Sequence, residues 1–216
     1  MNFKANNPVD ISLVKEFVYT AKKDAFAGSG KKVTLNNQNS VFSFRGYGEE
    51  NYKGDPKFAS MVYTDEYSGN TVEAGTETVS IGLCNVWRNQ YYGGSFLPYW
   101  TGEHVNALGI KSSKTITYLP FMTIEFLKMA LKQLPADFPV RGPKYIEADK
   151  VVYEGFEYWA QWEYVNMWEQ IPIYTTDDPF AAFQGKEIIK CNGTTVYWHG
   201  YQGGFLRDKY YPINLL

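Results

Sequence analysis

Two glutamates and one histidine are the side chains whose types and positions point most directly to chemistry. Glu77 and Glu187 each lie in a run typical of a β-strand, and each shares a strand face with apolar residues. Moving a carboxylate out of water costs several kcal/mol unless it is paired. Two carboxylates in one cavity could bind a cation or act as an acid–base pair with separated pKa values. His199 is a further candidate for a general base.

The expected turns decide which side chains share a face with each glutamate. Asn192-Gly193 is typical of a two-residue type I′ turn, and Gly82-Leu83 occupies the equivalent place in the other hairpin. This register places two pairs of residues opposite each other: Glu77 with Arg88, and Glu187 with Trp198. A three-residue turn would exchange the two faces, because side chains alternate along a strand.

The other face of each hairpin combines aromatic and polar side chains. It is predicted to hold Trp87, Asn89 and Tyr91 in the first hairpin, and Tyr197, His199 and Tyr201 in the second. Such a surface suits stacking on a planar or sugar-like ligand, with a few polar groups to orient it. Ordinary packing beneath a long loop is the alternative.

The sequence allows three environments for the carboxylates of Glu77 and Glu187. Each carboxylate could lie at the rim of the sheet with its head in water, or form a structural buried hydrogen bond or ion pair. The third possibility is that pseudo-twofold symmetry brings both carboxylates into a central cavity walled by aromatic side chains.

An internal repeat indicates how these residues are positioned. Residues 75–94 align without a gap with residues 185–204, and residues 16–21 align with residues 125–130 at nearly the same offset. We therefore predict an α+β fold built from a duplicated unit of one helix followed by antiparallel strands.

No linker separates the two copies, so they are expected to form two pseudo-symmetric halves of one domain that covers residues 1–216. The first repeat is placed at about 7–94 and the second at about 120–204.

Two apolar stripes at helical spacing predict the main helices. The first stripe follows an N-cap expected at Asn7-Pro8, and the second begins near Thr123 and ends before Pro135. The stripes comprise Ile11, Val14, Phe17, Val18 and Ala21, and then Ile124, Leu127, Leu131 and Leu134. Both are expected to pack into the core.

Further strands are expected outside the two hairpins, and long polar segments are expected to be loops. The expected strands are 41–45, 58–66, 151–159 and 164–174, and the expected loops are 27–40, 46–57 and 93–119. Loops of this length inside a compact domain are either functional or contain an element that the pattern does not reveal.

Composition excludes several classes of protein. The net charge of −2 argues against a general nucleic-acid or anionic-membrane binder, and no targeting segment or membrane span is expected, which favours the cytoplasm. The two cysteines are expected to be free, and no spacing suggests a metal site or a cofactor. The unusual feature is an excess of rings: 18 Tyr, 14 Phe and 6 Trp.

An ordered set of short motifs resembles an uncharacterised bacterial domain family, whose members occur alone or behind an XRE-type helix-turn-helix. In the first half the motifs are Tyr63–Gly69, Glu77, Val86-Trp87 and Tyr91–Gly93. In the second half they are Phe126–Leu131, Arg141–Pro143, Phe183–Glu187 and Tyr201–Gly204. The chain departs from the family by insertions at about 27–57 and 95–119 and by having no helix-turn-helix. The fusion to repressor domains implies, by analogy, a ligand-sensing or stress-linked role.

These observations favour a binding protein over an enzyme. The expected function is binding of a small aromatic or cationic molecule in an aromatic-lined cavity between the halves, by a monomer or homodimer. The candidate site comprises Glu77, Trp87, Asn89, Tyr91, Glu187, Tyr197, Trp198, His199 and Tyr201. The alternatives are a hydrolase that uses Glu77, Glu187 or His199 as acid or base, and a protein-interaction, immunity or regulatory module.

Overall fold

A computed structural model describes most of the chain. The described residues are 9–25, 32–35, 39–45, 55–69, 71–96, 102–116, 118–172, 177–206 and 213–214. The expected cap at Asn7-Pro8 and the segments 26–31 and 46–54 lie outside this set. The architecture is α+β, with a large antiparallel sheet and few helices, as the sequence predicts.

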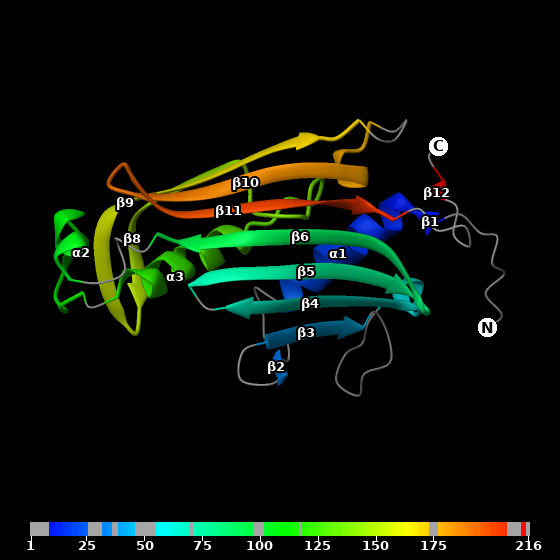
Figure 1. Ribbon diagram of the computed structural model, residues 1–216, viewed down its shortest axis with the longest axis horizontal. Helices are drawn as coiled ribbons and strands as arrows, with labels where there is room; N and C mark the ends of the chain where they lie inside the picture. Colours follow the sequence, from blue (N-terminus) through cyan, green and yellow to red (C-terminus); the bar gives the residue numbers. More distant parts are fainter. Residues whose placement is uncertain are drawn as a thin grey trace.

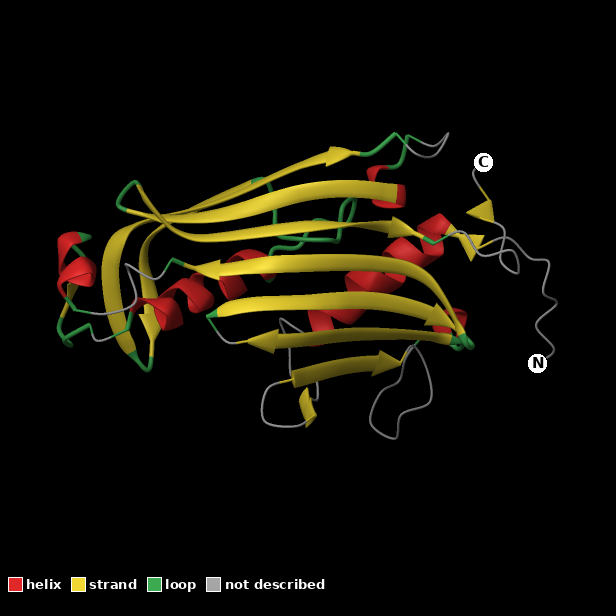
Figure 2. Ribbon diagram, viewed as in Figure 1, coloured by secondary structure: helices red, strands yellow, loops and turns green. Residues whose placement is uncertain are grey.

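One twisted ten-stranded sheet runs through the whole molecule (Figures 1 and 2). Its strands, in spatial order, are β2 (Lys32–Leu35), β3 (Asn39–Arg45), β4 (Met61–Gly69), β5 (Val72–Ile81), β6 (Cys84–Ser95), β11 (Thr194–Phe205), β10 (Ala182–Cys191), β9 (Phe156–Gln170) and β7 (Lys111–Ser112). β8 (Tyr145–Tyr153) also pairs with β9. The pairing of β6 with β11 joins the first part of the chain to the last.

Two helices lie behind the sheet in Figure 1, each over its own hydrophobic core. α1 (Ile11–Ala25) contributes Phe17 to a core that includes Trp87, and α3 (Leu119–Leu131) contributes Phe126 to a core that includes Trp162. All four of these rings are fully buried. Much of the aromatic excess is therefore used for packing.

α1 and α3 do not begin at the residues that the sequence predicts. The Asp10 carboxylate accepts hydrogen bonds from the backbone N–H groups of Ser12 and Leu13, so it caps α1. α3 begins at Leu119 instead of Thr123, because Pro120 falls in its first turn, where a missing N–H costs nothing.

The expected strand 151–159 is wrong, because the chain reverses within it. Glu154 and Gly155 both have positive φ angles, 50° and 79°, and form a tight turn between β8 and β9. β4 begins at Met61 because residues Pro56–Phe58 form a short 3₁₀ helix. The expected loop 93–119 contains the end of β6, α2 (Glu103–Ala107) and β7.

The remaining elements are short. β1 (Val9–Asp10) and β12 (Ile213–Asn214) form a separate two-stranded parallel sheet, and a 3₁₀ helix covers Pro179–Ala181. Cys84 and Cys191 are free, as expected. None of the helices in the described ranges is long and apolar enough to cross a membrane.

Candidate functional site

Two β-bulges decide which side chains face the helices. Both hairpins have the expected two-residue turns, at Gly82-Leu83 and Asn192-Gly193. A bulge then shifts the register of each hairpin by one residue, between Val79 and Ser80 and between Ile189 and Lys190. The extra residues are Val86 and Val196. A one-residue shift moves every later side chain to the other face.

The predicted pairing of the two glutamates is therefore wrong. Glu77 lies opposite Asn89, not Arg88, and Glu187 lies opposite His199, not Trp198. The polar and aromatic rows predicted for the far face lie on the helix side together with the glutamates. Eight of the predicted site residues are buried on this face: Glu77, Trp87, Asn89, Tyr91, Glu187, Tyr197, His199 and Tyr201. Trp198 faces the opposite way and is 37% exposed.

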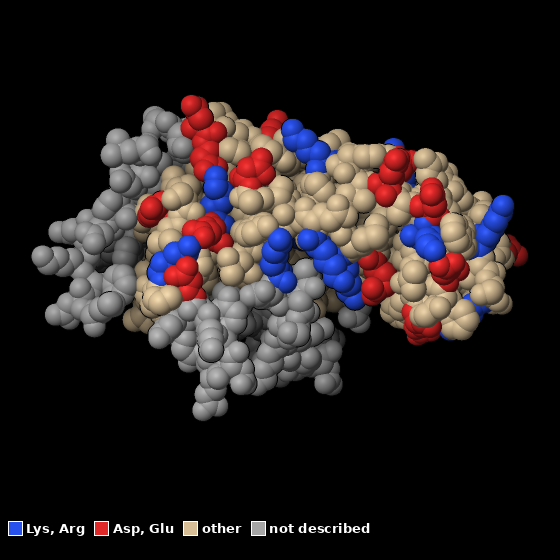
Figure 3. Space-filling model, turned by 180° about the vertical axis from the view of Figure 1, so that it is seen from behind, with Lys and Arg blue, Asp and Glu red and all other residues tan. Residues whose placement is uncertain are grey.

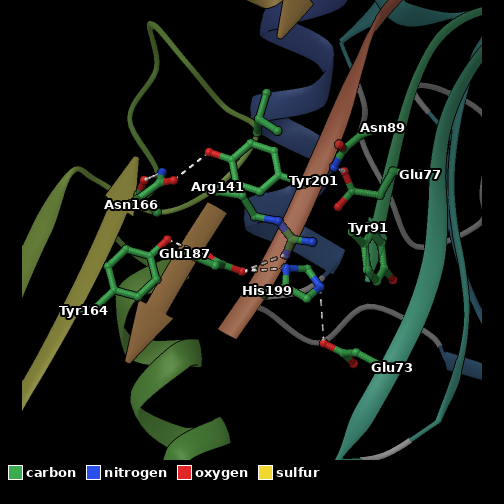
Figure 4. A network of polar contacts seen from close by, with 12 residues as sticks. Glu73, Glu77, Asn89, Tyr91, Arg141, Tyr164, Asn166, Glu187, His199 and Tyr201 are labelled. Atoms are coloured by element: carbon green, nitrogen blue, oxygen red, sulfur yellow. Dashed lines mark hydrogen bonds and ion pairs between the residues drawn. The ribbon is translucent and has the colours of Figure 1, made fainter. Parts of the chain in front are cut away.

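Glu187 is held by three side chains on this buried face (Figure 4). Its Oε1 is 2.9 Å from His199 Nδ1 and 3.7 Å from Arg141 Nη1. The Tyr164 hydroxyl donates to Glu187 Oε2 over 2.6 Å. These partners outweigh burial, and the pKa of Glu187 is lowered to about 2.

Glu77 has a cation of its own. Lys22, which α1 carries beneath the sheet, lies with Nζ 2.8 Å from Glu77 Oε2, and the Asn89 amide donates to the same oxygen over 2.8 Å. The Lys22 ammonium also donates to the carbonyl oxygen of Val140. Burial lowers the pKa of Lys22, while the attraction to Glu77 opposes this shift.

Arg141 links the two carboxylates. It lies in the segment after α3, is only 4% exposed, and its charge interacts favourably with both Glu77 and Glu187. Its guanidinium carbon lies 4.8 Å from the centre of the Tyr91 ring and 5.9 Å from that of Tyr201, within cation–π range. Its Nε and Nη2 atoms find no hydrogen-bond acceptor in the part of the chain that the structure describes.

A row of aromatic residues and glycines crosses the centre of the same face. Tyr91 and Tyr201 are direct partners at the β6–β11 pairing. On their other sides they pair with Gly75 and Gly185. A Cβ atom at either glycine would lie 2.4 or 2.5 Å from the tyrosine ring and hydroxyl, so both positions require glycine.

Each tyrosine hydroxyl reaches over its glycine to the next strand. The Tyr91 hydroxyl donates to Asp65 Oδ1 and the Tyr201 hydroxyl donates to Asn166 Oδ1, both over 2.6 Å. Asp65 is 1% exposed, and burial together with the charge of Glu77 raises its pKa to about 7.

The two glutamates lie on strands that are not neighbours. Glu77 and Glu187 lie on β5 and β10, with β6 and β11 between them, which corresponds to about 14 Å at normal strand spacing. Their side chains are 4% and 0% exposed, and that of His199 is 0% exposed. Within the described residues, no His, Cys, Asp and Glu cluster could hold a metal ion. We assign these groups to the stability of the fold.

The opposite face of the sheet carries a pocket of about 670 Å³, which we call the main pocket. It spans β6, β11, β10 and β9, and no described helix lies in front of these strands (Figure 1). Its exposed lining side chains are Gln90, Tyr92, Met167, Glu169, Gln184, Lys186, Trp198 and Gln202. The remaining lining residues are Tyr91, Trp168, Gly185, Gly200 and Tyr201.

An aromatic wall and a row of amides shape the main pocket. The Tyr92 and Trp198 rings meet edge to face with centroids 6.4 Å apart, and the Trp198 indole lies above Gly200. Gln202 pairs directly with both Gln90 and Gln184, so three amides lie side by side across neighbouring strands.

A second pocket, of about 430 Å³, adjoins the main pocket across β6. Gln90 and Tyr91 line both. The other lining residues of this polar pocket are Glu66, Tyr67, Ser68, Ala74, Gly75 and Thr76.

Three of the nine predicted site residues line the main pocket: Tyr91, Trp198 and Tyr201. The other six belong to the buried face. Arg141, Lys22 and the glutamine row are not among the residues predicted from the sequence. Lys22 adjoins the apolar stripe of α1, which is a usable sign of burial, whereas no pattern in the sequence places Arg141 beneath the sheet.

Acidic and basic side chains are interspersed on the face behind the sheet, so no extended patch of one sign is visible there among the described residues (Figure 3). The chemistry assigned to the protein comes from its own geometry, because no protein-family model, no curated protein and no solved structure matches the chain.

Proposed function

We propose that the protein binds a small, uncharged organic molecule in the main pocket. The observation that carries this proposal is the combination of an aromatic wall with three neighbouring amides in a pocket of about 670 Å³. That volume falls within the range of ligand sites, and such sites join apolar walls to a few polar groups that orient the ligand.

The polar groups of the pocket favour a neutral ligand. Gln90, Gln184 and Gln202 each offer a hydrogen-bond donor and an acceptor without a charge. The charged side chains of the pocket are Lys186 and Glu169, one of each sign, and Glu169 already accepts a hydrogen bond from Gln184. A molecule with one flat apolar face and several hydrogen-bonding groups would stack on Trp198 and bond to the amides.

Internal duplication would explain why the site lies where it does. Equivalent features recur about the Tyr91–Tyr201 pair: a bulge in each hairpin, a glycine beneath each tyrosine, and a tyrosine hydroxyl bonded to the next strand. We propose that the two halves are related by a pseudo-twofold axis at this pair, so that the main pocket straddles the junction of the halves. A ligand-sensing role also agrees with the resemblance to a family of which some members are fused to repressor domains.

Binding of planar probes to the purified protein tests this function. Riboflavin is neutral, proflavine is cationic and 8-anilinonaphthalene-1-sulfonate is anionic. Comparing their affinities shows which net charge the pocket prefers. We expect riboflavin to bind most tightly and to quench tryptophan fluorescence, and Trp198→Ala to weaken its binding about tenfold, as expected for the loss of one aromatic contact.

Trp159→Ala is the matched control, because Trp159 is an exposed tryptophan of β9 outside the main pocket. It should leave the affinity unchanged. If the two variants lose affinity equally, or if neither loses affinity, the probe binds elsewhere. Either result would contradict the proposed site.

A further inference from the structure

The two pockets form one groove across the front of the sheet. They share Gln90 and Tyr91 of β6. The other residues of the polar pocket lie on β4 and β5, and those of the main pocket lie on β6 (Tyr92), β11, β10 and β9. The groove crosses six neighbouring strands, from β4 to β9. Their five spacings give it a length of about 24 Å. A single small molecule would leave most of this length empty.

The lining changes along the groove from aromatic to polar. Trp198, Tyr92 and Met167 are exposed in the main pocket, while Ser68, Thr76 and Glu66 line the polar pocket. One row of direct cross-strand partners runs along the whole groove, and its members are Glu66, Thr76, Gln90, Gln202, Gln184 and Glu169. Every side chain in this row can hydrogen-bond, and the two carboxylates lie at its ends.

We infer that this groove binds an uncharged, extended oligosaccharide built from β-1,4-linked glucose-type rings. This inference rests on the proposed function and names its ligand class. Rings whose hydroxyls are all equatorial have flat C–H faces, which stack on indole and phenol rings. Their hydroxyls donate and accept hydrogen bonds around the rim, as the amide and hydroxyl row requires.

The charge of the groove distinguishes this ligand from a nucleic acid. Glu66 and Glu169 end the row and Lys186 is the one basic side chain among the lining residues of the two pockets. A phosphate backbone needs several basic contacts, whereas a neutral sugar chain needs none. The Trp198 indole packs directly over Gly200, so the glycine lets this ring lie close against the strand at the floor of the groove.

Titration calorimetry with sugars of increasing length tests the inference. The probes are glucose, cellobiose, cellotetraose and cellohexaose, the matching N-acetylglucosamine series, and maltohexaose as a chain of different shape. We expect at least one β-1,4 series to bind, with the hexamer at least about tenfold tighter than the dimer and tighter than maltohexaose. Trp198→Ala should weaken the binding of every length.

A blocking substitution separates the two pockets. Ala74 is exposed in the polar pocket and pairs with Tyr92, so Ala74→Trp would fill that pocket with a ring. The variant should remove the advantage of the hexamer over the dimer and leave the affinity for the dimer unchanged. Trp159→Ala, with an equal melting temperature, is the control for folding and for unspecific stacking.

Three results would overturn the inference. They are the absence of binding by all β-1,4 chains at millimolar concentration, an affinity independent of chain length, and a hexamer affinity that Ala74→Trp does not change. If riboflavin nevertheless binds and Trp198→Ala weakens it, the proposed function stands and the oligosaccharide assignment fails. If neither class of probe depends on Trp198, the proposed function fails as well.

Discussion

The pKa values of two buried carboxyl groups, Asp65 and Glu187, are shifted in opposite directions. The two shifts therefore have opposite effects on how the free energy of unfolding depends on pH. The pKa of Asp65 is raised to about 7 from 3.8, so the folded protein binds a proton that the unfolded chain releases. The free energy of unfolding therefore falls as the pH rises from about 4 to about 7. Glu187 has the opposite shift and contributes stability that is lost only when the pH falls towards 2.

Asp65→Asn should stabilise the protein at pH 8 by at least about 1 kcal/mol, the free energy of one pKa unit. The Tyr91 hydroxyl can donate to an amide oxygen as well, because the Tyr201 hydroxyl does so at Asn166. Urea unfolding at pH 5 and pH 8 measures the effect. The gain should be smaller at pH 5 than at pH 8, because the penalty of the carboxyl group disappears only near pH 4, and Asp137→Asn, at an exposed carboxylate, should change little at either pH. A loss of stability at pH 8 would show that the Asp65 carboxylate is needed in its charged form.

Glu187→Gln should cost about 3–5 kcal/mol, because it leaves the buried charge of Arg141 with one carboxylate fewer. The control is Glu157→Gln, which removes an exposed ion pair with Lys150 and should cost far less than Glu187→Gln, because solvent screens exposed charges. Denaturant titration of both variants at pH 7 compares them. Equal and small effects would mean that the buried network contributes nothing to the fold.

At the scale of the strand, the glycines beneath the two central tyrosines determine how closely neighbouring strands can pack. A Cβ atom at Gly185 would lie 2.5 Å from the Tyr201 ring and 2.7 Å from the carbonyl oxygen of Met167. Because one of these neighbours is backbone, rotation of a side chain cannot remove the clash.

Gly185→Ala should therefore destabilise the protein by about 1–3 kcal/mol, the usual cost of overpacking. Gly75→Ala should behave in the same way, since its Cβ would lie 2.8 Å from the carbonyl oxygen of Glu66. Ser68→Ala, an exposed strand position, should stay within about 0.5 kcal/mol of the unchanged protein in the same thermal melt. A neutral Gly185→Ala would mean that the Tyr201 ring does not cover this glycine.

Local patterns predict the elements well and their register poorly. The Asn192-Gly193 turn is confirmed, because both residues have the positive φ angles that the pair favours. The bulges reverse the faces assigned to the residues that follow them in β6 and β11, whereas the faces assigned in β5 and β10 hold. Val86-Trp87 and Val196-Tyr197 are consecutive apolar, buried residues, and burial alternates over the next five residues of each strand. Two adjacent apolar residues before an alternating stretch are the pattern by which the bulges could have been recognised.

The groove and the Arg141 contacts depend on residues far apart in the chain. Arg141 reaches Tyr91 and Glu187 from an irregular segment, which no periodicity describes. The amide row exists because β6 pairs with β11, and this pairing joins Gln90 to Gln202 across more than half the sequence. A single sequence contains no local feature that specifies such a pairing.

At the scale of the whole molecule, the two hydrophobic cores should unfold together. β6 and β11 pair along most of their length, and β10 and β11 each contribute side chains to both cores. Phe17→Ala in one core and Phe126→Ala in the other should each cost about 3–5 kcal/mol and give a single transition.

Hydrogen exchange resolved by peptide checks this cooperativity. Amides in the central strands β5 and β10 should exchange with the same free energy in the unchanged protein and lose protection together in both variants. Two separate transitions, with only one core affected by each substitution, would show that the halves fold independently.

The pairing of β1 with β12 brings positions near both ends of the chain to one corner of the molecule (Figure 1). Val9 lies beside Ile213, away from the groove residues on β4 to β9. The protein should therefore tolerate circular permutation, with a short linker across this corner and new termini opened at the exposed Gly82-Leu83 turn. The same geometry would let a reporter domain be fused at this corner and leave the front of the sheet open to ligand.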